Sequence, residues 1–151
     1  MNELNRIIDN LTSFGTKPNS CKAENLCNLK VLLIDLYRLF LHVSHDFDSE
    51  DYPNSPEINY NTIRKNVTLN FPELGYYHSI TESYKVSKEP IIIKGDAVDD
   101  LTDIIIDVLD VRWRMDNTSV NDALWHFDTS MKIHSEQHLV NLLTYLKDKM
   151  S

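Results

Sequence analysis

Two long helical patterns fill the chain from Gly95 to Met150, with only a short polar break between them. The first, GDAVDDLTDIIIDVLDVRW, repeats apolar residues along one side and aspartates along the other. The polar break spans residues 115–118, and the second pattern starts at Ser119. Because so short a connection keeps successive helices side by side, the sequence predicts an antiparallel helical hairpin.

The composition extends this prediction to the whole chain. Its 151 residues suit one domain with a hydrophobic core, so we expect a single helical domain over 1–151. The chain has only 3 glycines and 5 prolines, too few for the many tight turns of a sandwich or barrel. The sequence therefore predicts an all-α fold, a compact bundle of about five helices.

The first two thirds of the chain predict further helices over 3–14, 21–45 and 59–70. The second is apolar on most sides, so we expect it to be central, with neighbours on several faces. Residues 75–80 read as a turn. The segment 84–94 contains the run Ile91-Ile92-Ile93 without an evident partner strand, and we expect it to lie extended over the bundle.

Charge limits the possible partners. The formal net charge is -8 and the pI is about 5.1, so phosphate backbones and anionic membranes repel the chain. We expect no nucleic-acid or membrane partner; a basic protein or a metal cation fits the sign, and acidity that only aids solubility is the alternative. No secretory signal is evident, and Cys21 and Cys27 are expected to be free thiols, which predicts a cytoplasmic protein.

The aspartates of the first hairpin helix fall within an arc of about 100° on a helical wheel. Asp96 is a candidate N-cap, and carboxylates in the first turn suit the positive end of the helix. The later aspartates lie beyond the first turn and lack that explanation. Like charges four residues apart on a helix also repel each other. Three interpretations stay open: a solvated face, a surface for a cationic protein, and metal ligation. The arc comprises Asp96, Asp99, Asp100, Asp103, Asp107 and Asp110.

The second hairpin helix is predicted to bury both of its later histidines. With Ser119 as N-cap, its expected seam is Val120, Leu124, Phe127, Met131, His134, His138, Leu142 and Tyr145. His126 is expected to be exposed, whereas Trp113 and Trp125 are expected to anchor the core. Counting outward from the turn places His134 level with Asp99, and His138 level with Asp96.

Three roles are open for this histidine pair. The first is a buried histidine hydrogen-bonded to a carboxylate, and the second is a metal site in which HxxxH is completed by facing carboxylates. The third is a His–Asp general base. The candidate metal ligands are Asp96, Asp99, Asp100, Asp103, His134 and His138.

The segment EPIIIKGDAVDDLTDIIIDVL, followed by ALWHFDTSMKIHSEQHLVNLLTYL, resembles a bacterial family known as domain of unknown function 5063. Ser135 and Glu136 stand where the family has a Trp-Gly pair. The resemblance implies a helical fold in a bacterial protein and brings no activity. The residues that carry it are Gly95, Asp96, Ala97, Asp99, Asp100, Leu101, Asp103, Ile104, Trp125, Phe127, His134 and His138.

A second segment, DDLTDIIIDVL, is similar to the acidic helix of all-α nucleotide pyrophosphatases. Those enzymes bind magnesium through ExxE and ExxD pairs on adjacent helices. Here the earlier ExxE pair is missing, because Glu24 stands alone in its predicted helix. This likeness implies a metal-dependent hydrolase.

Two functions follow from these patterns. The first is a non-catalytic, acidic protein-interaction module of a bacterial cytoplasm, because the chain has no P-loop, GxGxxG or CxxC motif. The alternative is a metal-dependent (Mg, Mn or Zn) hydrolase that uses the Asp/His hairpin. No cofactor or tightly bound ion is expected, since neither cysteine belongs to the hairpin. An outward aspartate arc favours the first function, and an inward arc favours the second.

Overall fold

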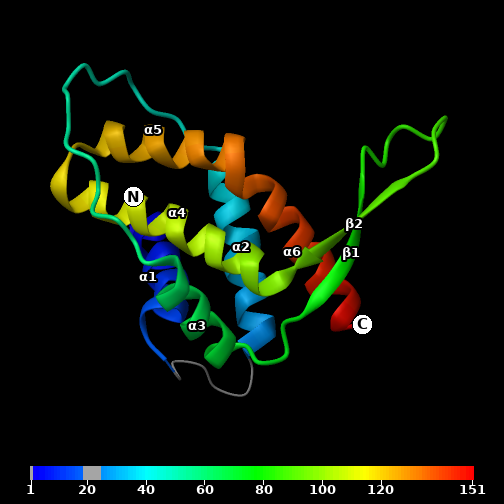
Figure 1. The fold of residues 1–151 in the computed structure, drawn as a ribbon. Helices are drawn as coiled ribbons and strands as arrows, with labels where there is room; N and C mark the ends of the chain where they lie inside the picture. The colour runs from blue at the N-terminus through cyan, green and yellow to red at the C-terminus, as the bar shows by residue number, and fades with distance from the viewer. Residues whose placement is uncertain (1, 19–24) are drawn as a thin grey trace.

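The structure, a computed structural model, describes residues 2–18 and 25–151 (Figure 1). Its helices pack around one hydrophobic cluster, and its two strands form a hairpin that leaves the helical body. The predicted all-α fold is confirmed. The elements are α1 (Asn2–Thr16), α2 (Asn25–Leu41), α3 (Tyr60–Asn70), β1 (Tyr76–Thr81), β2 (Ile91–Asp96), α4 (Ala97–Asn117), α5 (Val120–Ser130), the π-turn η1 (Met131–Ser135) and α6 (Glu136–Lys149).

Helix α4 is the centre of the bundle, in contact with α1, α3, α5 and α6. It begins as predicted, because the Asp96 side chain accepts a hydrogen bond from the backbone N–H of Val98. The prediction that the apolar helix α2 is central was wrong: α2 packs mainly on α1 and α6, and Val31 and Ile34 on its far side are exposed. The apolar face of α4 consists of Leu101, Ile104, Ile105, Val108 and Val111.

Gly15 brings three helices together. It lies in the last turn of α1, where an added Cβ would lie 2.7 Å from Ile63 of α3 and 2.8 Å from Ile105 of α4. Asn66 of α3 donates a hydrogen bond to the Gly15 carbonyl at 2.7 Å. The absence of a side chain at Gly15 therefore permits close packing of α1 against α3 and α4.

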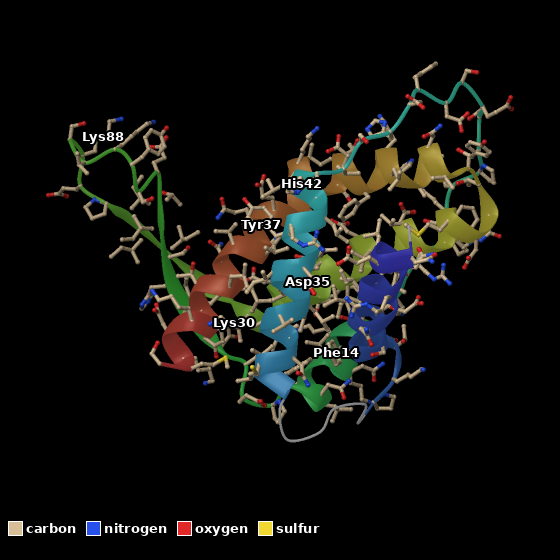
Figure 2. All side chains as sticks on the ribbon, turned by 180° about the vertical axis from the view of Figure 1, so that it is seen from behind. Phe14, Lys30, Asp35, Tyr37, His42 and Lys88 are labelled. Carbon is tan, nitrogen blue, oxygen red and sulfur yellow. The ribbon has the colours of Figure 1, made fainter. Side chains whose placement is uncertain are left out.

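The region between α3 and α4 differs from the prediction. Residues 75–80, expected as a turn, contain most of β1, which pairs antiparallel with β2. The run Ile91–Ile93 thus has a partner, and Ile92 lies opposite Ile80. The hairpin projects from the helices instead of lying over them, and Lys88 marks its outer end (Figure 2).

The last predicted helix is interrupted at residues 131–135 by a π-turn, where the chain changes direction between α5 and α6 (Figure 1). A π-turn inserts one residue into the helical repeat, so side chains beyond it are rotated. The buried seam continues from Met131 to Ser135 and Leu139, not to His134 and His138. The prediction that both histidines are buried was therefore wrong: His134 is exposed and His138 is half-buried.

Three further side-chain predictions failed on α5. Trp125, expected in the core, and Val120, expected in the seam, are exposed, whereas His126, expected to be exposed, is half-buried. The position of α5 turns His126 toward Asp110 of α4. The N-cap was predicted correctly, because the Ser119 hydroxyl accepts a hydrogen bond from the Asp122 N–H at 3.0 Å.

Cys27 is an exposed free thiol, and Cys21 lies outside the described residues.

None of the helices within 2–18 and 25–151 combines the length and the apolar character that crossing a lipid bilayer requires.

Candidate metal centre

The aspartate arc of α4 faces neighbouring side chains. At its start, Arg64 of α3 contacts Asp96 at 2.6 Å and Asp99 at 3.1 Å. Toward its end, Arg114 contacts Asp110 at 3.0 Å. These arginines offset the charge at both ends of the arc, and the aspartates between them meet the histidines of η1 and α6. The interpretation of the arc as a solvated face was wrong.

His138 is held by a buried carboxylate. Its Nδ1 atom lies 2.7 Å from Oδ1 of Asp100, which is 5 % exposed. The Tyr77 hydroxyl, from β1, donates to Oδ2 of the same carboxylate. Because the Asp100 carboxylate accepts a hydrogen bond from Nδ1, this nitrogen carries the proton. In the neutral ring, the lone pair of Nε2 is then available to bind a donor or a metal ion.

This contact also shifts ionisation equilibria. The hydrogen bond to Asp100 raises the pKa of His138 above its ordinary value, against the opposing effect of partial burial. Burial, followed by the hydrogen bond to Asp100, raises the pKa of the Tyr77 phenol. Tyr77 therefore stays a neutral hydroxyl donor, and the carboxylate of Asp100 is fixed by donors from two separate elements.

His134 is held in the same way by a second carboxylate. Its Nδ1 atom lies 2.9 Å from Oδ2 of Asp107, and the Ser135 hydroxyl donates to that oxygen at 2.5 Å. The π-turn makes this possible, because it turns Ser135 into the buried seam while His134 stays at the surface. Each histidine thus has its Nδ1 occupied by a carboxylate that has a further hydroxyl donor.

The Nε2 atom of His138 faces Asp103, and His134 lies beside this pair. Oδ2 of Asp103 lies 3.6 Å from Nε2 of His138, and the two imidazole centroids are 4.9 Å apart. One ligand atom from each of Asp103, His134 and His138 lies within 4.8 Å of the other two. Partial burial raises the pKa of Asp103, with the charge of His138 opposing it, so a nearby cation would relieve an unfavourable carboxylate.

The structure therefore divides the predicted ligands. It brings together Asp103, His134 and His138, and it places Asp100 behind His138. It does not bring Asp96 or Asp99 to the site: Arg64 binds both, and the Tyr60 hydroxyl donates to Asp99. The predicted partners across the two helices were wrong. His134 contacts Asp107 and not Asp99, and His138 contacts Asp100 and not Asp96. Counting along straight helices ignored the change of direction at the π-turn.

Sequence reasoning missed three supporting residues. Asp107 belonged to the predicted arc but not to the candidate ligands, because the predicted alignment of the two helices placed His134 beside Asp99 and not beside Asp107. Ser135 was placed outside the seam for the same reason. Tyr77 carried no sequence signal, since it comes from a strand that was predicted to be a turn.

His126 provides a contrast on the same hairpin. It lies 3.6 Å from Asp110 and 3.7 Å from Asp122, but Arg114 already contacts both carboxylates. Burial, followed by the charge of Arg114, lowers the pKa of His126. This histidine is part of a structural ion-pair cluster, with a cation already in place.

The surface beside the histidines is hollowed. A shallow pocket of about 340 Å³ is lined by His134, Gln137 and Val140, with Lys132, Ile133 and Glu136. A larger groove of about 1090 Å³ follows β1 and α6, and it shares Gln137 and Val140 with the shallow pocket. Of the three clustered residues only His134 lines either hollow, so the hollows lie beside the cluster, along α6.

Comparison with known proteins defines the fold. No protein-family model matches the chain, and no curated protein matches it either. The crystal structure of protein BF1032 from Bacteroides fragilis, a structural-genomics target, is similar with a TM-score of 0.77 at 20 % identity. The match covers 99 % of this chain and 90 % of that chain, so the whole architecture is shared. The resemblance to domain family 5063 stays a prediction.

Proposed function

We propose that Asp103, His134 and His138 bind a divalent transition-metal ion, and that the protein is a metal-dependent hydrolase. One observation carries the proposal: their ligand atoms lie within 4.8 Å of one another while carboxylates hold both histidines through Nδ1. Metal-binding histidines are oriented in this way, because a carboxylate at one nitrogen fixes the ring and makes the other nitrogen more basic.

The local charge supports a cation. Asp100, Asp103 and Asp107 lie on successive turns of α4, and the neighbouring arginines contact other aspartates of the arc. A divalent ion between Asp103 and the two Nε2 atoms would offset this negative charge. An inward aspartate arc was expected for a metal-dependent hydrolase and an outward arc for an interaction module. The inward direction of the arc therefore also favours the hydrolase.

The ligand types indicate the class of metal. Two imidazole nitrogens and one carboxylate oxygen suit zinc, manganese, iron or cobalt, whereas calcium and magnesium prefer oxygen ligands alone. Tetrahedral zinc with bonds of about 2.05 Å needs ligand atoms about 3.3 Å apart. The Asp103–His138 separation of 3.6 Å is near that value. The His134 side chain is 47 % exposed, so its ring can adjust about the Asp107 contact to complete the set.

Hydrolysis is the chemistry that such a ligand set supports. Three protein ligands leave a position for water, and a bound zinc-type ion lowers the pKa of that water to about 7. A substrate in the shallow pocket would lie beside His134, one of the three proposed ligands. This proposal departs from the sequence-based expectation that no tightly bound ion accompanies the protein.

Calorimetric titration of chelator-treated protein with zinc and manganese tests the proposal. We expect one ion per chain for the wild type and for the control variant His126→Gln. His138→Gln and Asp103→Asn should each weaken binding at least tenfold. Equal binding by wild type, His138→Gln and Asp103→Asn would exclude this site. Metal-dependent cleavage of ester and phosphoester substrates, lost in the same two variants, tests the hydrolase assignment.

The interaction module is kept as a second candidate because of one exposed segment. In the loop after α2, Phe47 is 90 % exposed and is accompanied by the exposed carboxylates of Asp46, Glu50 and Asp51. An aromatic ring among carboxylates suits a basic partner protein with an apolar pocket. Co-purification of a basic protein by the wild type but not by Phe47→Ser would support this candidate. Equal capture by both would count against it.

A further inference from the structure

The larger groove follows one face of α6. Its volume is about 1090 Å³, and it lies between α6 and the β1–β2 hairpin (Figure 1). The α6 residues that line it recur every three or four positions, which is the spacing of a single helix face. A helix rises about 1.5 Å per residue, so this face is about 18 Å long from Gln137 to Lys149. Between these two residues, the lining includes Val140, Asn141, Thr144 and Tyr145.

The opposite wall is the face of the hairpin that carries Tyr77. Ser79 and Ile93 are cross-strand partners on this face, because alternate residues of a strand point to the same side. The Tyr77 ring lies 5.6 Å from the Tyr145 ring of α6, so this face turns toward α6. Ile92, the neighbour of Ile93, lies on the other face and does not line the groove.

Tyr77 also connects the groove with the proposed metal site. Its hydroxyl donates to Asp100, and the same carboxylate holds His138. On α6, the Asn141 side chain hydrogen-bonds Tyr77, and Gln137 donates to Asn141 at 2.9 Å. The part of the groove beside His138 is therefore lined by uncharged polar groups of the kind that bind a carbonyl oxygen.

The rest of the lining has much apolar surface and little charge. Of the described residues that line the groove, two are acidic, Glu82 and Asp148, and Lys149 is basic. A phosphate group would therefore meet more negative than positive charge, whereas an uncharged apolar chain would be removed from water. The apolar and aromatic lining residues are Tyr77, Ile80, Tyr84, Ile93, Val140 and Tyr145.

We propose that this groove binds the acyl chain of an uncharged carboxylic ester, and that esters of this class are the substrate of the metal site. The inference rests on the proposed hydrolase function. The groove shares Gln137 and Val140 with the shallow pocket beside His134, so a chain in the groove would place its ester group toward the proposed ligands.

The reaction is simple hydrolysis. Water gives its hydroxyl group to the acyl carbon, the bond from that carbon to the alkoxy oxygen breaks, and the alkoxy oxygen takes up a proton. The acid product ionises at neutral pH. Its negative charge is repelled by the acidic lining, so the product leaves the groove more readily than the ester binds it.

Binding to the metal-free protein tests the groove separately from the chemistry. The probe is N-phenyl-1-naphthylamine, an uncharged apolar dye that fluoresces strongly out of water, and methyl decanoate is the competitor. Ile93→Lys and Ile92→Lys are matched, because the two isoleucines are adjacent and 42 % and 62 % exposed, and only Ile93 lines the groove. We expect the wild type and Ile92→Lys to bind alike and Ile93→Lys to bind about tenfold more weakly, since a charge enters the apolar lining.

A second pair of variants probes the α6 wall. Thr144→Trp fills the groove from an exposed position, and Lys147→Trp adds the same ring at an exposed position that does not line it. We expect only Thr144→Trp to weaken binding of the dye. Circular dichroism confirms that all four variants fold like the wild type.

Turnover with zinc bound tests the substrate class. For 4-nitrophenyl esters, kcat/KM should rise from acetate through butyrate to octanoate in the wild type and in Ile92→Lys. Ile93→Lys should lose this dependence on chain length. The phosphate 4-nitrophenyl phosphate has the same leaving group and should be a poor substrate. Asp103→Asn should lose ester cleavage and still bind the dye.

The failures of the two proposals are distinguishable. Equal dye binding and equal chain-length dependence in Ile93→Lys and Ile92→Lys would exclude the groove as the acyl site, whether or not the metal site is active. Dye binding that depends on Ile93, without zinc-dependent cleavage of any ester, would refute the hydrolase and with it the ester assignment. A preference for the phosphate would keep the hydrolase and overturn the ester class.

Discussion

His138 and Asp100 form the closest contact between α6 and the aspartate arc of α4, with Nδ1 and Oδ1 2.7 Å apart. Asp100 is buried beneath this contact and also accepts from Tyr77. One carboxylate thus ties together a central helix, the last helix and the base of the hairpin. The orientation of His138, and with it the proposed metal site, depends on this carboxylate.

Replacing Asp100 with asparagine tests its role in orienting His138. The variant keeps the size of the side chain but removes the charge that holds Nδ1. We expect metal affinity to fall about 10- to 100-fold while the stoichiometry stays at one ion. Calorimetric titration measures both quantities. Unchanged affinity would show that Asp100 has no part in holding the site.

Removing the Tyr77 hydroxyl should destabilise the fold. Tyr77→Phe keeps the ring but takes one donor from the buried Asp100 carboxylate, at a cost of about 1–3 kcal/mol in the free energy of unfolding. The control is Tyr76→Phe, since the neighbouring Tyr76 is 66 % exposed. Urea unfolding compares the two. Equal stabilities would mean that the Tyr77–Asp100 hydrogen bond contributes nothing.

Gly95 should be needed for the same contact. It lies opposite Tyr77 in the hairpin, and a Cβ added there would be 2.3 Å from Cζ of that ring. Gly95→Ala must displace the ring from Asp100, and we expect a loss of about 1–3 kcal/mol. Gly75→Ala is the control, because its nearest neighbour is the Tyr145 hydroxyl at 4.0 Å. Thermal or urea melts in which both variants match would contradict the packing described.

The pH dependence of stability should contain a contribution from His126. Its folded pKa lies below the unfolded value of about 6.5, because burial and then Arg114 disfavour the imidazolium. Stability from this group is therefore present above about pH 6.5 and is lost as the pH falls through the folded pKa. His126→Gln should lose less stability on acidification than the wild type. Parallel pH profiles from urea melts would refute this assignment.

The sequence predicted correctly those features of the helices that depend on neighbouring residues in the chain. The helix starts at Asp96 and Ser119 were predicted because a capping side chain acts within its own turn. The aspartate arc and its pairing with the HxxxH histidines followed from helical periodicity and a short connection. Asp103, His134 and His138 were therefore candidates from the sequence alone.

The remaining features depend on tertiary contacts. Nothing local in Met131–Ser135 specifies a π-turn, and its extra residue displaced the predicted seam by one position. β1 was missed because it is short and gains its hydrogen bonds from β2, across a connection of nine residues that carries no two-residue turn signal. With β1 missed, Tyr77 was absent from the predicted site, and Asp107 was absent because the helices meet at a different level.

The most direct test of the central claim is the position of a metal ion in a crystal of the protein grown with zinc. Anomalous diffraction at the zinc edge locates the ion without assumptions about its ligands. We predict a peak about 2.0–2.2 Å from Asp103 and from Nε2 of both His134 and His138, with Asp100 and Asp107 still bound to the Nδ1 atoms. A peak at His126 and Asp122 instead, or no peak on the hairpin at all, would contradict the account.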